Sequence, residues 1–441
     1  MEVHVESPGG LRRDLRVRIP ADRVSKAVSE RLQRYGNRAK LPGFRPGKAP
    51  AKVVEQQYGA AARMDAISDI VNQTYPEALG KAGVTPAGQP KIDITAESPG
   101  EALEYVAHIE VYPEIKLAGF DGVKIERPVV EVGEGDVDRL IDNLRKARRE
   151  FVAVERASQA GDTVKVDFLG KLDGEPFAGS EGKDVQFEIG AGQFLPDLEN
   201  GISGRKAGES FVVDVSFPAD YRAENLRSKT AQFEVQLKEV REPKLPEVDE
   251  AFLKTHGVED GAGVDGLRMK CRAALEKERD KAVQNRLKSQ ALEQLLSLNP
   301  IEIPGALIEQ EIPRLREEAA ARMNMAKVDA DKRKDLLPDA LFEQTARRRV
   351  ALGLLIGEVI KAQDLQLDAA RVEKALDDLA ADYEQPEQVK AFYRSRPDLL
   401  QGLRAMALED QVVESLIAGG TQSETPMALE ALLNPQQSAQ A

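Results

Sequence analysis

The sequence contains few of the residues that carry covalent or metal-assisted chemistry. Among its 441 residues there is no tryptophan, one cysteine and only three histidines. The single cysteine, Cys271, excludes an intramolecular disulfide framework, and we expect it to be a small core residue in a reducing compartment rather than a nucleophile. The histidines His4, His108 and His256 lie far apart and show no zinc-binding spacing, so no metal site is predicted.

Long apolar segments are also missing from the sequence. The most apolar run, residues 350–360, is shorter than the roughly 20 residues that a membrane-spanning helix needs, and it contains Glu358. The first residues show neither the basic region nor the apolar region of a secretory signal. No Gly-x-x-x-x-Gly-Lys-Ser/Thr phosphate loop occurs. We therefore expect a cytoplasmic protein that needs no ATP or other cofactor and has neither a membrane nor DNA as a partner.

Charge is distributed unevenly along the chain. With 41% hydrophobic and 31% charged residues, and a length that suggests about three domains, the composition is typical of globular multidomain proteins. The net charge is −13, yet residues 1–60 carry +7 and the remainder −20. Between Arg23 and Lys48 there are eight cations and a single acid, Glu30. This pattern fits either a polyanionic partner for the N-terminal part alone or a solvated helix face.

The segment of residues 43–50 lies inside this basic region. Its two glycines and two prolines end the helices predicted on either side, which places it at the tip of a helical hairpin. Phe44 stands there with Arg45 and Lys48 close by. An aromatic residue between cations on a rigid tip suits docking onto an anionic, partly apolar surface, whereas Phe44 could instead fold back and plug the two helices.

The N-terminal part is predicted to be a compact α+β domain, residues 1–112, followed by a connector at residues 113–149. The apolar periodicity predicts a strand at 11–19, helices beginning at Pro20 and Pro50, a longer helix ending near 80–83, and strands at 91–95 and 103–112. The connector is extended at first and then helical, since apolar residues recur at helical spacing from Glu134 onward.

Residues 150–242 differ in composition, because they hold eight of the thirteen phenylalanines. Apolar residues alternate in several short runs, Asp173-Gly174 predicts a hairpin turn, and one short helix fits near residues 195–201. These signals predict a small antiparallel sheet domain with one helix.

Residues 243–441 are predicted to be almost entirely helical, because apolar residues recur there at helical spacing. From about residue 419 the composition predicts a frayed tail, apart from a short helical turn at 427–433. The fold class expected for the whole chain is therefore α+β multidomain.

The tip segment fits the pattern G-F-R-x-G-K-x-P and resembles the ribosome-attachment signature of the trigger factor family, bacterial chaperones that meet nascent chains at the ribosomal exit tunnel. The resemblance implies contact with the large ribosomal subunit, with a tunnel-exit ribosomal protein and ribosomal RNA as partners. The implied contact residues are Gly43, Phe44, Arg45, Pro46, Gly47 and Lys48. Pro46 occupies the variable position, where a lysine would have added a cation.

The sheet domain resembles FKBP-type peptidyl-prolyl isomerases. The similar stretches are, in order, Val166-Asp167-Phe168-Leu169-Gly170, Gly174-Glu175-Pro176-Phe177, Phe187-Glu188-Ile189-Gly190, Phe194 to Gly201, Phe217-Pro218 with Asp220-Tyr221, and Phe233-Glu234-Val235. The resemblance implies a proline pocket lined by Phe168, Phe177, Leu195, Leu198, Tyr221 and Phe233.

Two positions depart from the isomerase pattern. Asp197-Leu198 stands where these isomerases usually have Gly-Phe or Gly-Trp, so leucine replaces a large aromatic pocket floor. Ala178 follows Phe177, where many small members carry an acid. The domain is accordingly either an active isomerase or a degenerate domain kept as a binding module.

The helical part resembles the body and arms of the trigger factor family, most closely at residues 286–291 and 353–360. In that family this region forms a cradle that holds unfolded chains through scattered apolar patches. Candidate holding residues are Ile312, Leu315, Met323 and Met325, each of which could equally pack between helices.

Taken over the whole chain, the resemblance implies an ATP-independent chaperone that binds ribosomes near the exit tunnel and holds nascent polypeptides. It also implies catalysis of X-Pro cis/trans isomerisation during folding and export, and a homodimer away from the ribosome. Two other functions stay open from the sequence: a ribosome-independent folding isomerase, and a holdase with an inactive isomerase domain.

Overall fold

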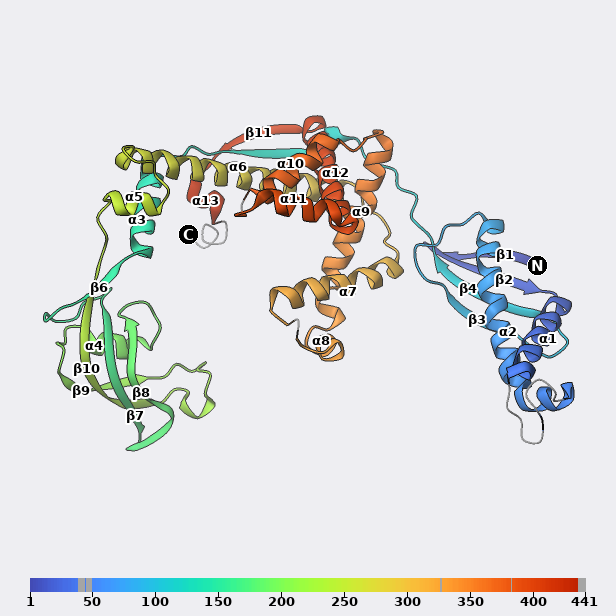
Figure 1. Cartoon of the computed structure of the whole chain (residues 1–441), viewed down its shortest axis with the longest axis horizontal. Coiled ribbons are helices and arrows are strands. Elements are labelled where there is room, and N and C mark those ends of the chain that lie inside the picture. The colour runs from blue at the N-terminus through green and yellow to red at the C-terminus, as the bar shows by residue number, and fades with distance from the viewer. Residues whose placement is uncertain (39–43, 45–49, 326, 382, 435–441) are drawn as a thin grey trace. The chain divides into compact units, whose positions relative to one another are not determined.

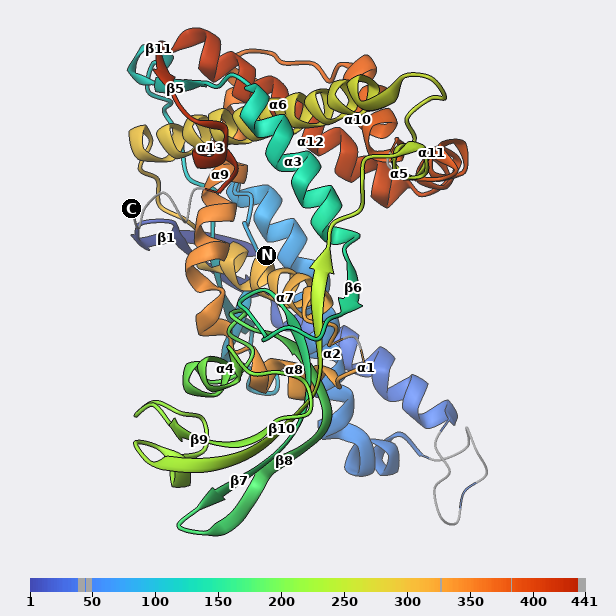
Figure 2. The same cartoon turned by 90° about the vertical axis from the view of Figure 1, so that its left-hand side faces the viewer.

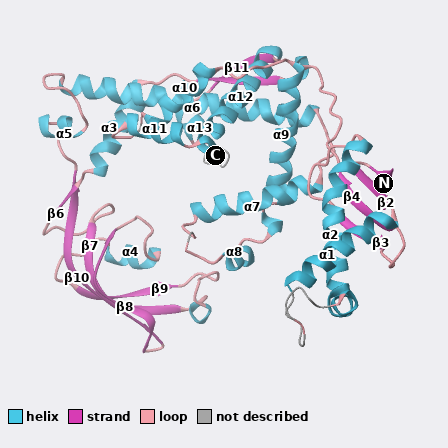
Figure 3. Cartoon of the chain, turned by 45° about the vertical axis from the view of Figure 1, so that its right-hand side comes forward, coloured by secondary structure: helices cyan, strands magenta, loops and turns pink. Residues whose placement is uncertain are grey.

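The computed structural model describes residues 1–38, 44, 50–325, 327–381 and 383–434 (Figure 1). By internal contacts the chain divides into two units, Met1–Arg127 with Gln284–Thr425, and Pro128–Val283 with Pro426–Ala441. Each unit contains one larger sheet, and much of the remaining chain is helical (Figure 3). None of the described helices is long and apolar enough to cross a membrane.

An antiparallel sheet of four strands forms the N-terminal part of the first unit. Its strands, in spatial order, are β1 (Glu2–Gly9), β2 (Arg12–Ile19), β4 (Leu103–Glu110) and β3 (Lys91–Ala96). The three predicted strands are confirmed. The sequence does not predict β1, because this edge strand is exposed along almost its whole length and lacks a buried face.

Two helices, α1 (Ala21–Arg38) and α2 (Ala51–Ala82), pack with this sheet. Two helices were expected after Pro50. The structure instead has one continuous helix, α2, and Gly59 lies within it. At the end of α2, Gly83 adopts a left-handed φ of 65° and its N–H reaches the Leu79 carbonyl. The shared core includes Leu15, Val17, Ile19, Ile67, Ile70 and Tyr105.

The second unit contains a five-stranded antiparallel sheet. Its strands run in the order β6 (Glu150–Ala153), β10 (Thr230–Lys244), β7 (Thr163–Leu172) and β8 (Glu175–Glu188), with β9 (Ser210–Ser216) also paired to β10. Asp173 and Gly174 have φ values of 53° and 89°, which confirms the predicted hairpin turn. Helix α4 (Pro196–Ile202) lies beside the sheet and confirms the predicted short helix (Figure 2). A 3-10 turn, η2, spans Glu224–Leu226.

The helices of the second unit enclose a separate core. They are α3 (Glu134–Ala147), α5 (Glu250–Thr255), the first part of α6 (Gly263–Leu298) and α13 (Leu429–Leu433). Cys271 of α6 is buried there, as expected for a small core residue. Burial raises the pKa of its thiol, which leaves the thiol less nucleophilic.

The first unit also holds the remaining helices, and they confirm the predicted helical region. They are α7 (Gly305–Arg322), α8 (Ala330–Leu336), α9 (Glu343–Ala362), α10 (Ala369–Ala380), α11 (Pro386–Ser395) and α12 (Pro397–Gly419), with 3-10 turns η1 (Phe120–Gly122) and η3 (Asp339–Leu341). Helices α7 and α9 pack together, and α10, α11 and α12 form a second packed group.

The predicted frayed tail is wrong for the residues directly after 419. Strand β11 (Thr421–Pro426) pairs with β5 (Lys124–Val129), and the Thr421 N–H donates to the Val123 carbonyl at 2.8 Å. Backbone hydrogen bonds hold this exposed polar segment, so composition alone does not reveal it. The predicted turn at 427–433 is confirmed as α13.

Candidate functional site

Three phenylalanine rings from neighbouring strands meet on one side of the second sheet. The ring centroid of Phe233 on β10 lies 5.9 Å from that of Phe168 on β7 and 6.2 Å from that of Phe177 on β8. Gly170 lies opposite Phe233 in the β7–β10 register. A Cβ atom at this position would lie 2.8 Å from the Phe233 ring and 3.2 Å from the Phe177 ring, so glycine gives the rings room to meet.

All six predicted pocket residues fall in one hydrophobic cluster. Leu198 of α4 and Phe233 are buried, with 2% and 7% exposure, and form its floor. The other four are half-buried: Phe168, Phe177, Leu195 and Tyr221. The cluster therefore has a buried floor and partly exposed walls, as a shallow apolar binding site requires.

Two further aromatic residues belong to this site, although they were not among the predicted pocket residues. Phe217 lies between Phe177 and Tyr221, with ring centroids 6.1 and 4.7 Å away. Phe194 meets Phe168 edge to face at 5.8 Å and packs on Phe187 at 4.5 Å. Both lie in stretches that resemble the isomerase pattern, so the order of those stretches was the signal that could have identified them.

The departure at Asp197 has a structural role. One carboxylate oxygen of Asp197 accepts a hydrogen bond from the Ser216 N–H at 2.9 Å, which joins α4 to β9. The side chains named for the cluster are apolar except for the Tyr221 hydroxyl. Within the described ranges, no group of three or more His, Cys, Asp or Glu residues could hold a metal ion. The site thus offers a largely apolar environment.

At the N-terminal hairpin, only Phe44 of the predicted attachment residues is described, and its side chain is 40% exposed. Gly43, Arg45, Pro46, Gly47 and Lys48 lie outside the described residues.

Farther along the hairpin, Tyr35 of α1 stacks on Tyr58 of α2 with ring centroids 5.4 Å apart. The Tyr35 hydroxyl donates a hydrogen bond to Asp65 at 2.8 Å, and this bond raises the pKa of Tyr35. These contacts join the two helices on the tip side of the hairpin.

Part of the basic charge on α1 is neutralised within the hairpin. Arg31 pairs with Asp69 of α2 at 2.6 Å, and Arg23 approaches Glu77 at 3.5 Å. Lys26 and Arg34 are exposed. The sequence shows a helix face of one sign, whereas the structure shows that acids of α2 meet two of its cations.

The predicted holding residues divide into two groups. Ile312 and Leu315 are 8% and 4% exposed, so for these two the alternative of packing between helices holds: they pack with Ala346 of α9. Met323 is 62% exposed, and Met325 is half-buried. Two exposed leucines were not predicted, Leu336 of α8 and Leu341 of η3, at 62% and 63% exposure.

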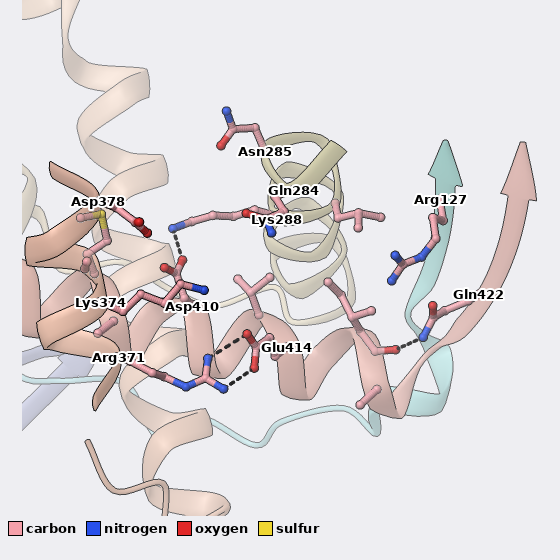
Figure 4. Close-up of a pocket in the computed structure, with 17 residues that line it drawn as sticks. Arg127, Gln284, Asn285, Lys288, Arg371, Lys374, Asp378, Asp410, Glu414 and Gln422 are labelled. Carbon is pink, nitrogen blue, oxygen red and sulfur yellow. Dashed lines mark hydrogen bonds and ion pairs between the residues drawn. The ribbon is translucent and has the colours of Figure 1, made fainter. Parts of the chain in front are cut away.

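The helical part of the first unit also contains a cavity of about 610 Å³ between α6, α10 and α12 (Figure 4). Its lining includes the apolar side chains of Leu287, Met406, Val413 and Ile417. Two ion pairs cross the lining, Lys288 with Asp410 at 2.7 Å and Arg371 with Glu414 at 2.7 Å. Its volume lies within the range usual for ligand-binding sites.

Comparison with known proteins assigns the chain to a family. Models described as bacterial trigger factor protein, FKBP-type peptidyl-prolyl cis-trans isomerase, and bacterial trigger factor protein C-terminus match residues 1–144, 154–238 and 263–418. The trigger factor of Thioalkalivibrio sulfidiphilus is 43% identical over 435 residues, 99% of this chain and 98% of that relative. The chain belongs to the trigger factor family.

A second relative agrees with this assignment. The trigger factor of Pseudomonas paraeruginosa is 40% identical over the full length of both chains. A solved structure of the trigger factor chaperone covers 95% of this chain and 99% of its own, at 19% identity and a TM-score of 0.47. As a trigger factor family member, the chain is a chaperone with an FKBP-type peptidyl-prolyl isomerase domain, and the family implies binding of ribosomes and nascent chains.

In the isomerase domain of this trigger factor family member, a buried aspartate is held by several hydrogen bonds. The Asp162 side chain is 3% exposed, and its carboxylate accepts hydrogen bonds from Arg156 at 2.6 and 2.9 Å and from the Gln159 N–H at 2.8 Å. Burial by itself raises the pKa of Asp162, but the hydrogen bonds from Arg156 and Gln159 outweigh it, so the pKa lies below its ordinary value.

The substitution Asp162→Asn is expected to destabilise this domain by about 1–3 kcal/mol at neutral pH, because it removes a charge-assisted pair. The folded-state pKa is the lower one, so this stabilisation is present above the unfolded pKa near 4 and is lost as pH falls through the folded value. The difference between wild type and variant should therefore shrink below about pH 4. Hydrogen exchange of the backbone amides of residues 154–190, followed in the whole chain, measures this difference in stability.

The matched control is Asp184→Asn, which removes an exposed acid of the same sheet that pairs with Lys165 and Lys238 at 3.0 Å. Its effect should stay below about 1 kcal/mol. Equal protection in wild type and Asp162→Asn at neutral pH would contradict the assigned role of Asp162.

Proposed function

We propose that the aromatic cluster of the isomerase domain is the site where X-Pro bonds are isomerised, with Phe168, Phe177, Leu195, Leu198, Tyr221 and Phe233 as the residues that line it. The observation that carries the proposal is the meeting of the Phe168 and Phe177 rings over Phe233 beside a buried Leu198. Phe194 and Phe217 extend the walls.

X-Pro isomerisation requires only a suitable shape and low polarity from these side chains. Rotation about a peptide C–N bond has a barrier of about 18–20 kcal/mol, because resonance and water stabilise the planar, charge-separated amide. Uncatalysed X-Pro isomerisation takes tens to hundreds of seconds and can limit folding. Apolar walls remove water from the planar amide and so favour the twisted form. No bond breaks, so neither a nucleophile nor a general base is needed.

The leucine at the floor of the pocket affects which side chains contact a bound proline. Leu198 presents less surface than the Phe or Trp usual at this position, so contact with a bound proline ring falls more on the walls. Phe168 and Phe177 are half-buried and Phe194 meets Phe168 directly, which supports this division of roles. Acceleration of cis/trans isomerisation of an X-Pro peptide by the whole chain tests the pocket. A rate equal to the uncatalysed one would favour a holdase with an inactive domain.

Ribosome binding is assigned to the hairpin tip in this proposal, with the large subunit near the tunnel exit as the docking site. Phe44, 40% exposed, would provide apolar contact. Arg45 would pair with an acidic side chain of a ribosomal protein, while the cations of the N-terminal part would meet ribosomal RNA. The charge of +7 on residues 1–60 in an otherwise acidic chain supports a polyanionic partner.

Clients would be held by apolar side chains of the helical part, without ATP. Met323, Leu336 and Leu341 are each more than 60% exposed, and the cavity beside Met406 places apolar side chains next to charged ones. A cytoplasmic location, a homodimer away from the ribosome, and boundaries at residues 112, 149 and 242 belong to the same proposal.

The holding surface is tested by replacing Met323, Leu336 and Leu341 together with serine. If each side chain contributes about 0.5 kcal/mol to holding, affinity for an unfolded client should fall about tenfold. Aggregation of a chemically unfolded protein, measured by light scattering against chaperone concentration, reports the change. Met269→Ser, at a position that is 73% exposed on α6, is the control. Equal suppression by the triple variant and wild type would remove these residues from the holding surface.

A further inference from the structure

The buried carboxylate of Glu199 stands out in the isomerase domain because its hydrogen bonds go only to loop backbone. Glu199 is 5% exposed and follows Leu198 on α4. One carboxylate oxygen accepts from the Gly190 N–H at 2.8 Å and the other from the Phe194 N–H at 3.0 Å. Among the described residues no cation forms an ion pair with it, in contrast to Asp162. Burying a carboxylate is costly, so these two bonds are the compensation that the fold provides.

The two donors bracket the loop that joins β8 to α4. This loop reads Gly190-Ala191-Gly192-Gln193 before Phe194, and its first four residues are exposed. Gly190 and Gly192 have φ values of 91° and 68°, a conformation open mainly to glycine. Small exposed residues supply almost no packing that could hold such a loop in one place. The Glu199 side chain supplies the fixed points instead, one at each end.

The loop leads directly into a wall of the proposed pocket. Phe194, whose N–H is held by Glu199, places its ring 5.8 Å from Phe168 and 4.5 Å from Phe187. Leu195, the next residue, precedes α4 and is a half-buried member of the same cluster. A shift of the Phe194 backbone would therefore move both the Phe194 ring, which packs against Phe168, and the Leu195 side chain in the wall.

We propose that Glu199 is a positioning residue for isomerisation: by holding the Gly190 and Phe194 N–H groups it fixes the Phe194–Leu195 wall at the distance that an X-Pro segment needs. The small Leu198 floor makes this wall decisive, since less of the contact comes from below. Glu199 acts through the wall and makes no contact with the substrate itself. This inference rests on the proposed pocket.

The test compares Glu199→Gln and Glu199→Ala with wild type in the whole chain. Glutamine keeps the size but offers one acceptor oxygen and turns an NH₂ group toward the other N–H donor, so one hydrogen bond is lost. We expect kcat/KM for an X-Pro peptide to fall about tenfold in Glu199→Gln, with hydrogen exchange accelerated in residues 190–195 and unchanged in β7 and β10. In folded Glu199→Ala protein, kcat/KM should fall further. Asn200→Ala, an exposed neighbour on α4, should change neither quantity.

Two outcomes would overturn the inference. One is a kcat/KM of Glu199→Gln within twofold of wild type, whatever the exchange in the loop. The other is a lower kcat/KM with exchange raised equally across β7 and β10, which is the pattern of a purely structural role. Phe177→Ala keeps this inference apart from the pocket itself: if that variant is fully active the pocket proposal fails, and if only Glu199→Gln is fully active the positioning role alone fails.

Discussion

Replacing Phe44, Arg45 and Pro46 together with alanine is expected to abolish co-sedimentation of the chain with ribosomes. Phe44 is 40% exposed and lies within the most basic part of the chain. An aromatic anchor and an adjacent arginine are the side chains that most often dominate an interface, at about 2 kcal/mol or more each. Losing about 4 kcal/mol lowers affinity about a thousandfold, which takes binding below detection at micromolar concentrations.

The control for the tip variant removes a similar pair of side chains elsewhere. Phe392 and Arg394 of α11 are both exposed, and Phe392 is 54% so. The variant Phe392→Ala with Arg394→Ala should sediment with ribosomes as wild type does. The tip variant should also keep its full X-Pro isomerase activity, because the tip and the aromatic pocket belong to different units of the chain. Ribosome binding unchanged in the tip variant would defeat the assignment of attachment to these residues.

Truncating Phe177 to alanine is expected to lower kcat/KM for X-Pro isomerisation about thirtyfold. The Phe177 ring is half-buried and lies 6.1 Å from Phe217 and 6.2 Å from Phe233, so it forms a wall while the floor stays in place. An aromatic wall that desolvates the reacting amide contributes about 2 kcal/mol, which corresponds to about thirtyfold in rate. The relaxation of a cis X-Pro peptide to its equilibrium mixture measures the change.

Val212→Ala is the matched control for the pocket variant. Val212 belongs to β9 of the same sheet but is 58% exposed, so its loss should leave kcat/KM within twofold of wild type. Hydrogen exchange of β7 and β10 should be unchanged in both variants, which separates the pocket from domain stability. A fully active and folded Phe177→Ala variant would show that the X-Pro segment binds elsewhere.

The aromatic cluster could be predicted from sequence because strand geometry and motif order act together. Alternate positions of a strand face the same side, so Phe168 and Phe233 share a face once the strands pair. Phe217 escaped prediction as a site residue, because a phenylalanine at the end of a strand has the same pattern whether it lines a site or fills a core. The two roles are distinguished only by the residues that contact the Phe217 ring, Phe177 and Tyr221.

The holding residues show where helical periodicity stops being informative. Ile312, Leu315 and Met323 all lie in or directly after one amphipathic helix, yet α9 covers the first two and leaves the methionine exposed. Which face a neighbouring helix covers depends on tertiary packing, which the pattern of one helix does not contain. In the same way, strand β11 has no apolar alternation, so only its pairing with β5 identifies it.

Isomerisation at the aromatic cluster is tested most directly by the rate at which the whole chain isomerises an X-Pro peptide, measured in parallel for wild type, Phe177→Ala, Val212→Ala and the tip variant. We expect clear acceleration by wild type despite the leucine floor at Leu198, similar acceleration by Val212→Ala and the tip variant, and a rate about thirtyfold lower for Phe177→Ala. A wild-type rate no faster than the uncatalysed reaction would contradict this expectation, because the aromatic cluster would then bind chains without isomerising them.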